Sequence, residues 1–325
     1  MPVPVTRCVI DDPQLAELSG LVADDGGLWA IADGGRRVQA HRLDPESCAV
    51  RESRSTDVDP RDPEDLARGP DGTLWVGDIG DNDLRRDTVA VIELPASGAS
   101  RLHRLTYPDG PHDAEALLID AAGRPVVVIK DVAPAGIYRT ETRPDGIGPT
   151  PLTRVGTVAL PPSTTPGGPL GGLGARVVTG AAATADGRVV ALRSYTDAWL
   201  FEVPDGDVVA ALAGVPVRVP LPNEPQGEAI AFDPSGALLS GSETRGGTAG
   251  EIRLVPGAAA LAGAPPASDA VPPPGAGSDD AASPPEVGRP QPTPEWWPAA
   301  IGAGALGALL LAVVLAMTWR GARRR

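Results

Sequence analysis

The chain has 325 residues, enough for one large domain or two ordinary ones. Its 40 glycines and 37 prolines, together with only 3% aromatic residues, favour many short strands and turns over long helices. The net charge of −14 argues against nucleic acid as a partner, because phosphates require a basic surface. This charge instead suits a solvated exterior or a site for cations.

The N-terminal segment, MPVPVTRCVI, has neither the basic region nor the apolar region of a signal peptide. Either the true start lies upstream, or the protein is tail-anchored with its globular part in the cytoplasm. The charge distribution at the C-terminus, described below, favours the first alternative.

An internal repeat follows the N-terminal segment. Each unit begins with a short apolar run, a turn containing Asp or Gly, and a second apolar run, which is typical of a β-hairpin. The units begin 47 to 64 residues apart, at Glu17, Glu64, Glu115, Thr179 and Glu228. This spacing is in the range of four-stranded propeller blades.

Two further strands follow each hairpin except the fifth, which has only EIRLVP left. The N-terminal TRCVIDD can complete that blade and remove a free sheet edge. The sequence therefore predicts an all-β, five-bladed β-propeller over residues 1–256, closed by an N-terminal strand. A six-bladed propeller is the alternative if one unit has diverged.

The two cysteines show no metal-ligand spacing. Ring closure places Cys8 on the outer strand of the last blade, and Cys48 begins the outer strand of the neighbouring first blade. We therefore expect a disulfide between them; two unrelated buried thiols are the alternative.

Charged residues recur where the inner strand of each unit starts and where the second strand ends. Because antiparallel strands bring these ends together, we expect them at one rim of the channel. The predicted pairs are Glu17 with Asp33, Glu64 with Asp78, Glu115 with Lys130, Thr179 with Arg193, and Glu228 with Glu243. This rim would hold seven carboxylates and two cations.

Converging carboxylates repel one another, so something must balance them. A divalent cation such as Ca²⁺ is one solution, with ligands from Glu17, Glu64, Glu115, Glu228 and Asp78. The alternative is neutralisation by Lys130 and Arg193, with water and raised pKa values accounting for the remainder.

Other catalytic signals are weak. The chain has no G-x-S-x-G motif, and His41, His103 and His112 share no metal spacing. His41 and His103 are expected at surface or edge positions. The Gly-rich run from Pro161 to Ala175 is expected to form a loop over one face of the propeller, either as a flexible lid or as a mobile insertion.

Residues 257–295 are almost all Pro, Ala, Gly, Ser and Asp and predict a disordered stalk. Residues 296–319 follow, with two tryptophans before an uncharged apolar run and a third after it, which predicts a transmembrane helix. Residues 320–325 contain four arginines and predict a cytoplasmic tail, because positive charge marks the cytoplasmic side. The expected location is the cell membrane, with the propeller outside and the lipid bilayer contacted through this helix.

Several motifs resemble those of gluconolactonase-like and phytase-esterase-like propeller proteins, especially uncharacterised membrane-anchored bacterial members. The motifs are the opening ELSGL, the block PEDLARGPDGTLWVGDIGDN, and the repeats DAEALLID and QGEAIAF. The resemblance covers about residues 8 to 256 and implies a divalent metal on the channel axis, with Glu17 at the position of the first ligand. Asn82 lies on a loop, and Thr179 stands where a further ligand would be expected.

Two functions fit these features. The first is a membrane-anchored binding or scaffolding module with a cation in its channel, whose partner is an extracytoplasmic small molecule or protein. The alternative is a metal-dependent hydrolase of lactones or of phosphate or carboxylic esters. An open coordination position beside a pocket would distinguish the enzyme.

Overall fold

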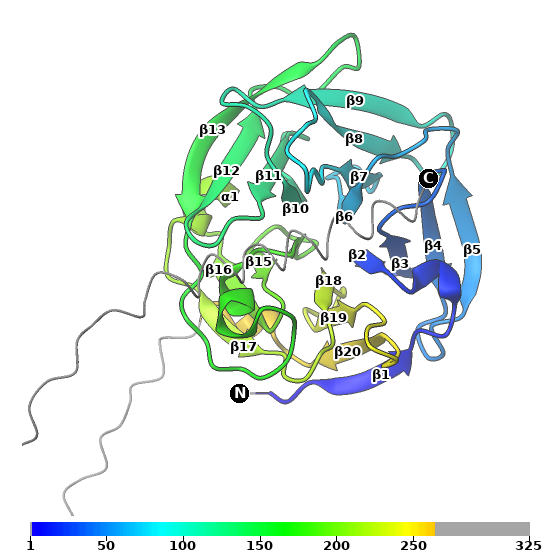
Figure 1. Ribbon diagram of the computed structural model, residues 1–325, viewed down its shortest axis with the longest axis vertical. Coiled ribbons are helices and arrows are strands. Elements are labelled where there is room, and N and C mark those ends of the chain that lie inside the picture. Colours follow the sequence, from blue (N-terminus) through cyan, green and yellow to red (C-terminus); the bar gives the residue numbers. More distant parts are fainter. Residues whose placement is uncertain (1, 264–325) are drawn as a thin grey trace, which may run out of the picture. The chain divides into compact units, whose positions relative to one another are not determined.

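The computed structural model describes residues 2–263. Twenty strands in this part form five groups of four around a central axis (Figure 1). Two of these groups join into one eight-stranded sheet through a two-residue parallel contact, Thr150 with Leu105 and Pro151 with Thr106. The predicted all-β propeller of five blades is confirmed for the described residues.

Within each blade the strands are antiparallel neighbours and run from the axis outward. Blade 1 contains β2 (Leu18–Asp24), β3 (Gly27–Ala32), β4 (Gln39–Leu43) and β5 (Val50–Ser55). Blade 2 contains β6 (Pro63–Arg68), β7 (Leu74–Asp78), β8 (Val89–Leu94) and β9 (Arg101–Thr106). Blade 3 contains β10 (Ala114–Ile119), β11 (Pro125–Ile129), β12 (Ala135–Thr140) and β13 (Thr150–Val158).

Blade 4 contains β14 (Gly180–Ala183), β15 (Val189–Arg193), β16 (Asp197–Glu202) and β17 (Val217–Pro220). Blade 5 contains β18 (Gly227–Phe232), β19 (Leu238–Ser242), β20 (Glu251–Val255) and the N-terminal β1 (Val5–Val9). The helical elements are short: α1 (Val208–Leu212) and the 3₁₀ turns η1 (Pro13–Leu15), η2 (Gly171–Arg176) and η3 (Ala259–Leu261).

The N-terminal strand closes the ring as predicted. β1 pairs antiparallel with β20, with Val5 opposite Leu254 and Val9 opposite Glu251. Thr6 Oγ1 also donates a hydrogen bond to Glu251 at 2.8 Å. The last blade therefore combines strands from both ends of the described chain.

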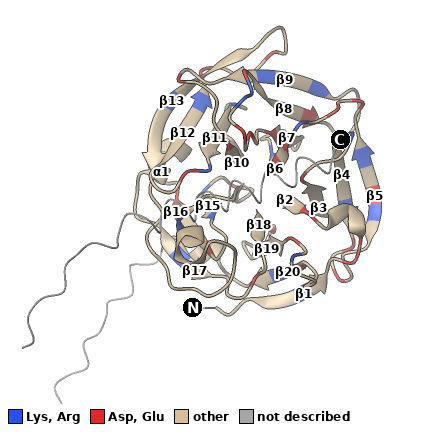
Figure 2. Cartoon of the chain, in the orientation of Figure 1, with Lys and Arg blue, Asp and Glu red and all other residues tan. Residues whose placement is uncertain are grey.

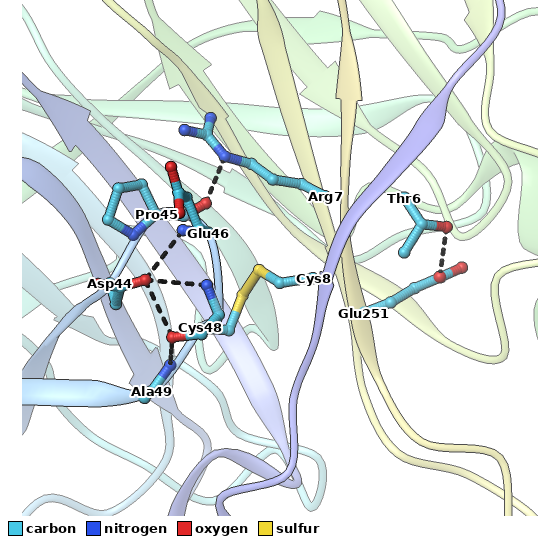
Figure 3. The surroundings of a disulfide bond; sticks show 10 residues. Thr6, Arg7, Cys8, Asp44, Pro45, Glu46, Cys48, Ala49 and Glu251 are labelled. Atoms are coloured by element: carbon cyan, nitrogen blue, oxygen red, sulfur yellow. Dashed lines mark hydrogen bonds between the residues drawn. A yellow bond between two sulfur atoms is a disulfide. The ribbon is translucent and has the colours of Figure 1, made fainter.

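A disulfide connects this closing strand to the first blade (Figure 3). The Cα atoms of Cys8 and Cys48 are 5.7 Å apart, within the range that a disulfide requires. Arg7 Nε donates to the carbonyl oxygen of Pro45 at 2.6 Å beside the bridge. The predicted Cys8–Cys48 pairing is confirmed.

The first hairpin of each blade turns on an Asp whose side chain accepts a backbone N–H within the turn. In blade 2, Asp71 accepts from Thr73 N at 3.0 Å. Gly72 completes this turn with φ +79°, a backbone conformation that is unfavourable for residues with a Cβ atom. These turns lie at the end of the channel opposite the predicted rim.

The hydrophobic core consists of layers between neighbouring blades rather than one central cluster. Blades 1 and 2 meet at Trp29, Ile31, Leu66 and Val76, all nearly inaccessible to solvent. The apolar faces of the blades thus cover one another around the ring.

The predicted stalk, transmembrane helix and cytoplasmic tail (residues 257–295, 296–319 and 320–325) lie outside the described residues, apart from residues 257–263. Among the residues that are described, no helix is both long and apolar enough to cross a membrane.

Candidate functional site

The inner strands of four blades begin with a β-bulge. The register shifts between Leu18 and Gly20, Pro63 and Asp65, Ala114 and Ala116, and Gly227 and Ala229. The extra residue in the bulge is Ser19, Glu64, Glu115 or Glu228, whereas β14 of blade 4 pairs regularly. A bulge re-aims a side chain, and here it brings three glutamates to one level of the channel.

The predicted equivalence of Glu17 with these glutamates is corrected by the bulge. Ser19 occupies that position in blade 1, and Glu17 lies two residues earlier. The residues equivalent to Glu17 are Asp62, Asp113 and Gln226, each of which uses its backbone carbonyl to accept an N–H from the end of the second strand or the residues after it. The sequence contains this signal as E-L-S, D-P-E, D-A-E and Q-G-E at the four strand entrances.

Three carboxylates of neighbouring blades meet at the rim end of the channel, the acidic mouth. Asp33 of blade 1 and Asp62 and Glu64 of blade 2 each offer an oxygen, and these oxygens lie within 4.8 Å of one another. Oδ1 of Asp33 is buried and has no hydrogen-bond partner among the described residues. Figure 2 shows acidic residues around β6 and β7 near the axis, whereas arginines mark the outer strands β5, β9 and β13.

Gly80 allows this convergence. A Cβ on Gly80 would lie 2.6 Å from Oδ2 of Asp62 and would also collide with Glu64 Oε1. The backbone at Gly80 therefore borders the space between the two carboxylates, and any other residue would fill it.

The environment raises the pKa values of all three carboxyls. Burial and then the charges of Asp62, Glu17 and Glu228 raise the pKa of Asp33 to about 7. Burial and Asp113 raise the pKa of Asp62, and burial followed by Asp33 and Asp62 raises the pKa of Glu64 well above its usual range. A bound cation would reverse this balance, since an opposite charge favours the ionised form.

The blade 5 side of the mouth holds a second carboxyl pair. Glu243 shares a side-chain hydrogen bond with Glu228, and burial followed by the charge of Glu228 raises the pKa of Glu243 to about 10. Gln226 Nε2 donates to Glu228 Oε1 at 2.8 Å. Glu17 lies close enough to Glu243 to add to this shift. Glu243 is therefore protonated at neutral pH.

Lys130, the chain's single lysine, forms an ion pair with Glu115 on the blade 3 side. Its Nζ lies 6.0 Å from the ring centroid of Tyr195, which is 5% exposed. The Gly-rich loop packs on this tyrosine, because a Cβ on Gly168 would lie 2.8 Å from Tyr195 Cβ. The expected loop over one face of the propeller is therefore present and covers the acidic mouth at Tyr195.

Two residues predicted at the rim have other roles. Asp78 ends β7 opposite Pro63, and its Oδ1 accepts from Arg86 Nη1 at 3.0 Å and from two backbone N–H groups. Asp78 pairs with Pro63 as Ala32 pairs with Leu18, so that Ile79 rather than Asp78 corresponds to Asp33. Asp78 is therefore held in a buried ion pair with Arg86 and contacts the cluster through the backbone N–H of Asp62.

Arg193 is completely buried and points into blade 5. Its guanidinium forms an ion pair with Glu224, which is also inaccessible, and Nη1 donates to the carbonyl oxygen of Ala229 at 3.0 Å. Thr179 Oγ1 donates to the carbonyl oxygen of Gly227 at 3.0 Å. These blade 4 residues connect blades 4 and 5, so Arg193 does not neutralise the rim.

Asp65 was not among the predicted site residues, and it connects the inner strands of three blades. Asp65 is inaccessible to solvent; its Oδ1 accepts from Leu66 N at 2.8 Å, and its Oδ2 accepts from Leu117 N at 2.8 Å and Ala181 N at 3.1 Å. The equivalent bulge neighbours in blades 1, 3 and 5 are Gly20, Ala116 and Ala229. One carboxyl thus occupies the axis and satisfies backbone donors of three blades.

The histidines lie outside the cluster. His41 and His103 are both buried; His41 lies on the third strand of blade 1, contrary to the expected surface or edge position, whereas His103 lies on β9, the outer strand of blade 2. His41 Nδ1 is 2.8 Å from Ser53 Oγ, and it lines a cavity of about 230 Å³ that also reaches Glu17 and Asp33. This cavity gives solvent or a small molecule a route to Asp33.

The residues of the cluster fit a divalent cation. Three carboxylates offer hard oxygen ligands, one oxygen of Asp33 lacks a partner among the described residues, and Gly80 leaves the adjoining space free. Asp33, Asp62 and Glu64 would hold the ion, with Glu64 the only one of these three that the predicted ligand set contained.

No protein-family model and no curated protein sequence matches the chain. Its solved structural neighbours include gluconolactonase-like proteins and virginiamycin B lyase. The gluconolactonase XC5397 from Xanthomonas campestris is 17% identical, with a TM-score of 0.42 and coverage of 78% of this chain and 84% of that one. Catalytically inactive virginiamycin B lyase from Staphylococcus aureus, solved with quinupristin, is 13% identical, with a TM-score of 0.38 and coverage of 76% and 68%.

A further neighbour is the PQQ-bound aldose sugar dehydrogenase from Streptomyces coelicolor, which is 13% identical with a TM-score of 0.40 and coverage of 77% and 96%. These identities are too low to transfer an activity, so the geometry of the acidic mouth has to indicate the function.

Proposed function

We propose that the acidic mouth binds a divalent cation and that the protein is a metal-dependent hydrolase of lactones or esters. The observation that supports this most directly is the convergence of Asp33, Asp62 and Glu64 oxygens within 4.8 Å. When bound, a divalent cation polarises the carbonyl oxygen of such a substrate. The cavity beside Asp33 leaves one side of the cluster accessible.

The Glu228–Glu243 pair supplies the proton transfers of this proposal. Glu228 accepts a proton from the attacking water, whose oxygen bonds to the carbonyl carbon. As the bond from that carbon to the alkoxy oxygen breaks, Glu243 donates its proton to the leaving oxygen, and the proton on Glu228 then restores Glu243. Burial and the charge of Glu228 raise the pKa of Glu243 to about 10, which keeps this group protonated as the acid.

Lys130 contributes a fixed positive charge beside the cluster. Its ion pair with Glu115 fixes the position of Nζ on the blade 3 side. Burial, Asp33 and Asp62 raise the pKa of Glu64, and the charge of Lys130 opposes this rise. Lys130 and Glu115 are thus positioning residues in this proposal.

A binding module with a structural cation is the second candidate. Glu64 and Glu228 are each only 4% exposed, and deeply buried ligands are typical of a closed metal site. The two candidates differ in whether a coordination position remains open for substrate.

Thermal unfolding of the chelator-treated full-length protein tests the cation site. Millimolar Ca²⁺, Mg²⁺, Mn²⁺ or Zn²⁺ should raise the Tm, because a ligand of the native state stabilises it by mass action. Glu64→Gln should lose most of that rise, whereas Glu52→Gln, on the exposed outer strand β5, should retain it. A Tm that no ion changes would refute the site.

Hydrolysis of a lactone and ester panel, with and without the ion, tests the reaction. Glu243→Gln should lower kcat by about 10²-fold or more, the usual contribution of a general acid, while the ion still raises its Tm. Ion binding without any hydrolysis would favour the binding module.

We further propose that the propeller is extracytoplasmic and anchored through residues 296–319. The disulfide suits an oxidising compartment, and the arginines of residues 320–325 suit the cytoplasmic side. Protease added to intact cells should release a fragment ending within residues 257–295. Release from lysed cells alone would contradict this orientation.

A further inference from the structure

Exposed aliphatic side chains occur on several loops of the acidic face. Nine large hydrophobic residues of the described chain are exposed, and four of them lie on loops that leave the rim. Leu84 is on the β7–β8 loop and is 56% exposed, Val132 on the β11–β12 loop is 50% exposed, and Leu170 and Leu173 on the β13–β14 loop are 50% and 56% exposed.

Two of these residues also have a disfavoured backbone. Leu84 has φ +53° and Leu170 has φ +66°, in the left-handed region that residues with bulky side chains rarely adopt. Each position therefore combines backbone strain with an apolar side chain in solvent. Asn or Gly would remove both costs, which points to a function for the leucine side chains.

These loops are connected to the residues of the site. Leu84 N donates to the carbonyl oxygen of Asp81, and Asp81 N donates to Oδ1 of Asp113, whose charge raises the pKa of Asp62. This series of contacts links Leu84 to the blade 2 side of the cluster.

The other aliphatic residues connect to Lys130 and Tyr195. Val132 follows Lys130 by two residues and forms a β-bridge with Val177. Leu173 N donates to the carbonyl oxygen of Leu170, and Tyr195 N donates to the carbonyl oxygen of Gly174 in the same turn. The aliphatic side chains therefore border the mouth on blades 2, 3 and 4, whereas the cavity beside Asp33 lies on blades 1 and 2.

We propose that Leu84, Val132, Leu170 and Leu173 form an apolar lip that binds the hydrocarbon part of the substrate. This inference rests on the proposed hydrolase and specifies its substrate class: a lactone or ester that carries an alkyl or aryl chain. The carbonyl group lies at the acidic cluster, and the chain lies across the loops of blades 2 to 4.

Binding of ketones, which cannot be hydrolysed, tests the lip. The full-length protein is titrated with cyclopentanone and with 2-hexylcyclopentanone by calorimetry, in the presence of Ca²⁺ and after chelation. The hexyl chain should tighten binding by at least ~10-fold, since each fully buried methylene contributes about 4-fold.

Leu84→Asn and Leu170→Asn are the informative variants, because Asn tolerates the left-handed backbone. They should reduce the gain from the hexyl chain by about 5-fold or more, retain the affinity for cyclopentanone, and unfold at the same or a higher temperature. Ile147→Asn and Val215→Asn are matched controls at exposed positions on loops outside the rim, 89% and 96% exposed, and should keep the gain.

The proposed lip would be refuted if the hexyl chain increased the affinity equally in the wild type and both leucine variants, or if it did not increase the affinity of the wild type. Loss of binding to phosphatidylcholine vesicles in the variants, with no gain from the hexyl chain, would also overturn it and assign these residues to a lipid surface. If the hexyl gain is present but Ca²⁺ changes neither affinity nor Tm, the lip stands and the cation site fails.

Discussion

Replacement of Asp65 should weaken the junction of three blades. Its carboxyl group accepts backbone N–H groups from Leu66, Leu117 and Ala181, which belong to blades 2, 3 and 4. All three donors lie on residues that are at most 1% exposed. In Asp65→Ala these donors lose their acceptor where water has little access.

The cost can be estimated from the donors. A buried N–H without a partner costs about 1–3 kcal/mol, so three would cost about 3–9 kcal/mol. Removing the buried carboxyl recovers part of this cost, because burial raises its pKa well above the usual range. We expect a net loss of about 3–5 kcal/mol, or a fall in Tm of roughly 6–20 °C for a domain of this size.

Asp65→Asn separates shape from charge. The amide oxygen can accept from both Leu117 and Ala181, whereas the amide nitrogen faces the Leu66 N–H, so one hydrogen bond is lost. We expect a loss of about 1 kcal/mol. Asp186→Ala is a control, because Asp186 likewise accepts a backbone N–H but lies in an exposed turn.

Calorimetric unfolding of the full-length protein at one pH measures these differences. A Tm for Asp65→Ala equal to that of the wild type, or no lower than that of Asp186→Ala, would show that the central carboxyl does not stabilise the blade junction.

Three other predictions concern pH, a buried ion pair and the disulfide. Because the pKa of Asp33 is raised to about 7, the stability of the chelated protein should fall as pH rises from about 4 through 7, and Asp33→Asn should flatten this part of the Tm profile. Glu224→Gln should lower the free energy of unfolding by about 3–5 kcal/mol in urea titrations, because Arg193 is left buried without its counter-charge; a change under about 1 kcal/mol would contradict this role. Cys8→Ser with Cys48→Ser should cost roughly 4 kcal/mol for a bridge spanning 40 residues, and the reduced wild type should unfold at the same urea concentration as the double variant.

The repeat was sufficient to predict the blades and the ring closure. Each hairpin has its own turn signal, and the fifth unit lacks a strand that only the N-terminal segment could supply. The disulfide followed from that closure, because it makes the outer strands of blades 5 and 1 neighbours.

The site was predicted less well because the repeats were aligned on their glutamates. Aligning Glu17 with Glu64 matched residue types, but Ser19 holds the bulge position of Glu64 in blade 1, and Glu17 corresponds to Asp62. A shift of one residue also turns a strand side chain to the other face, which is why Asp78 meets Arg86.

The long-range contacts of buried side chains also could not be predicted from the sequence. Asp65 accepts from Ala181, which is 116 residues away, and Glu224 pairs with Arg193 across two blades. Such contacts depend on the angle between blades, and no local pattern in the chain records that angle.

The closing strand has a consequence for synthesis of the chain. Thr6 and its partner Glu251 are 245 residues apart, so β1 emerges from the ribosome long before its own blade exists. Cys48 emerges much earlier than Glu251. A disulfide between Cys8 and Cys48 would then hold β1 against the nascent first blade. β1 would then already lie next to the position that β20 takes up, and its edge would be partly shielded from other chains. We expect the bridge to matter most for the yield of folded protein, because this edge would otherwise stay free for most of translation.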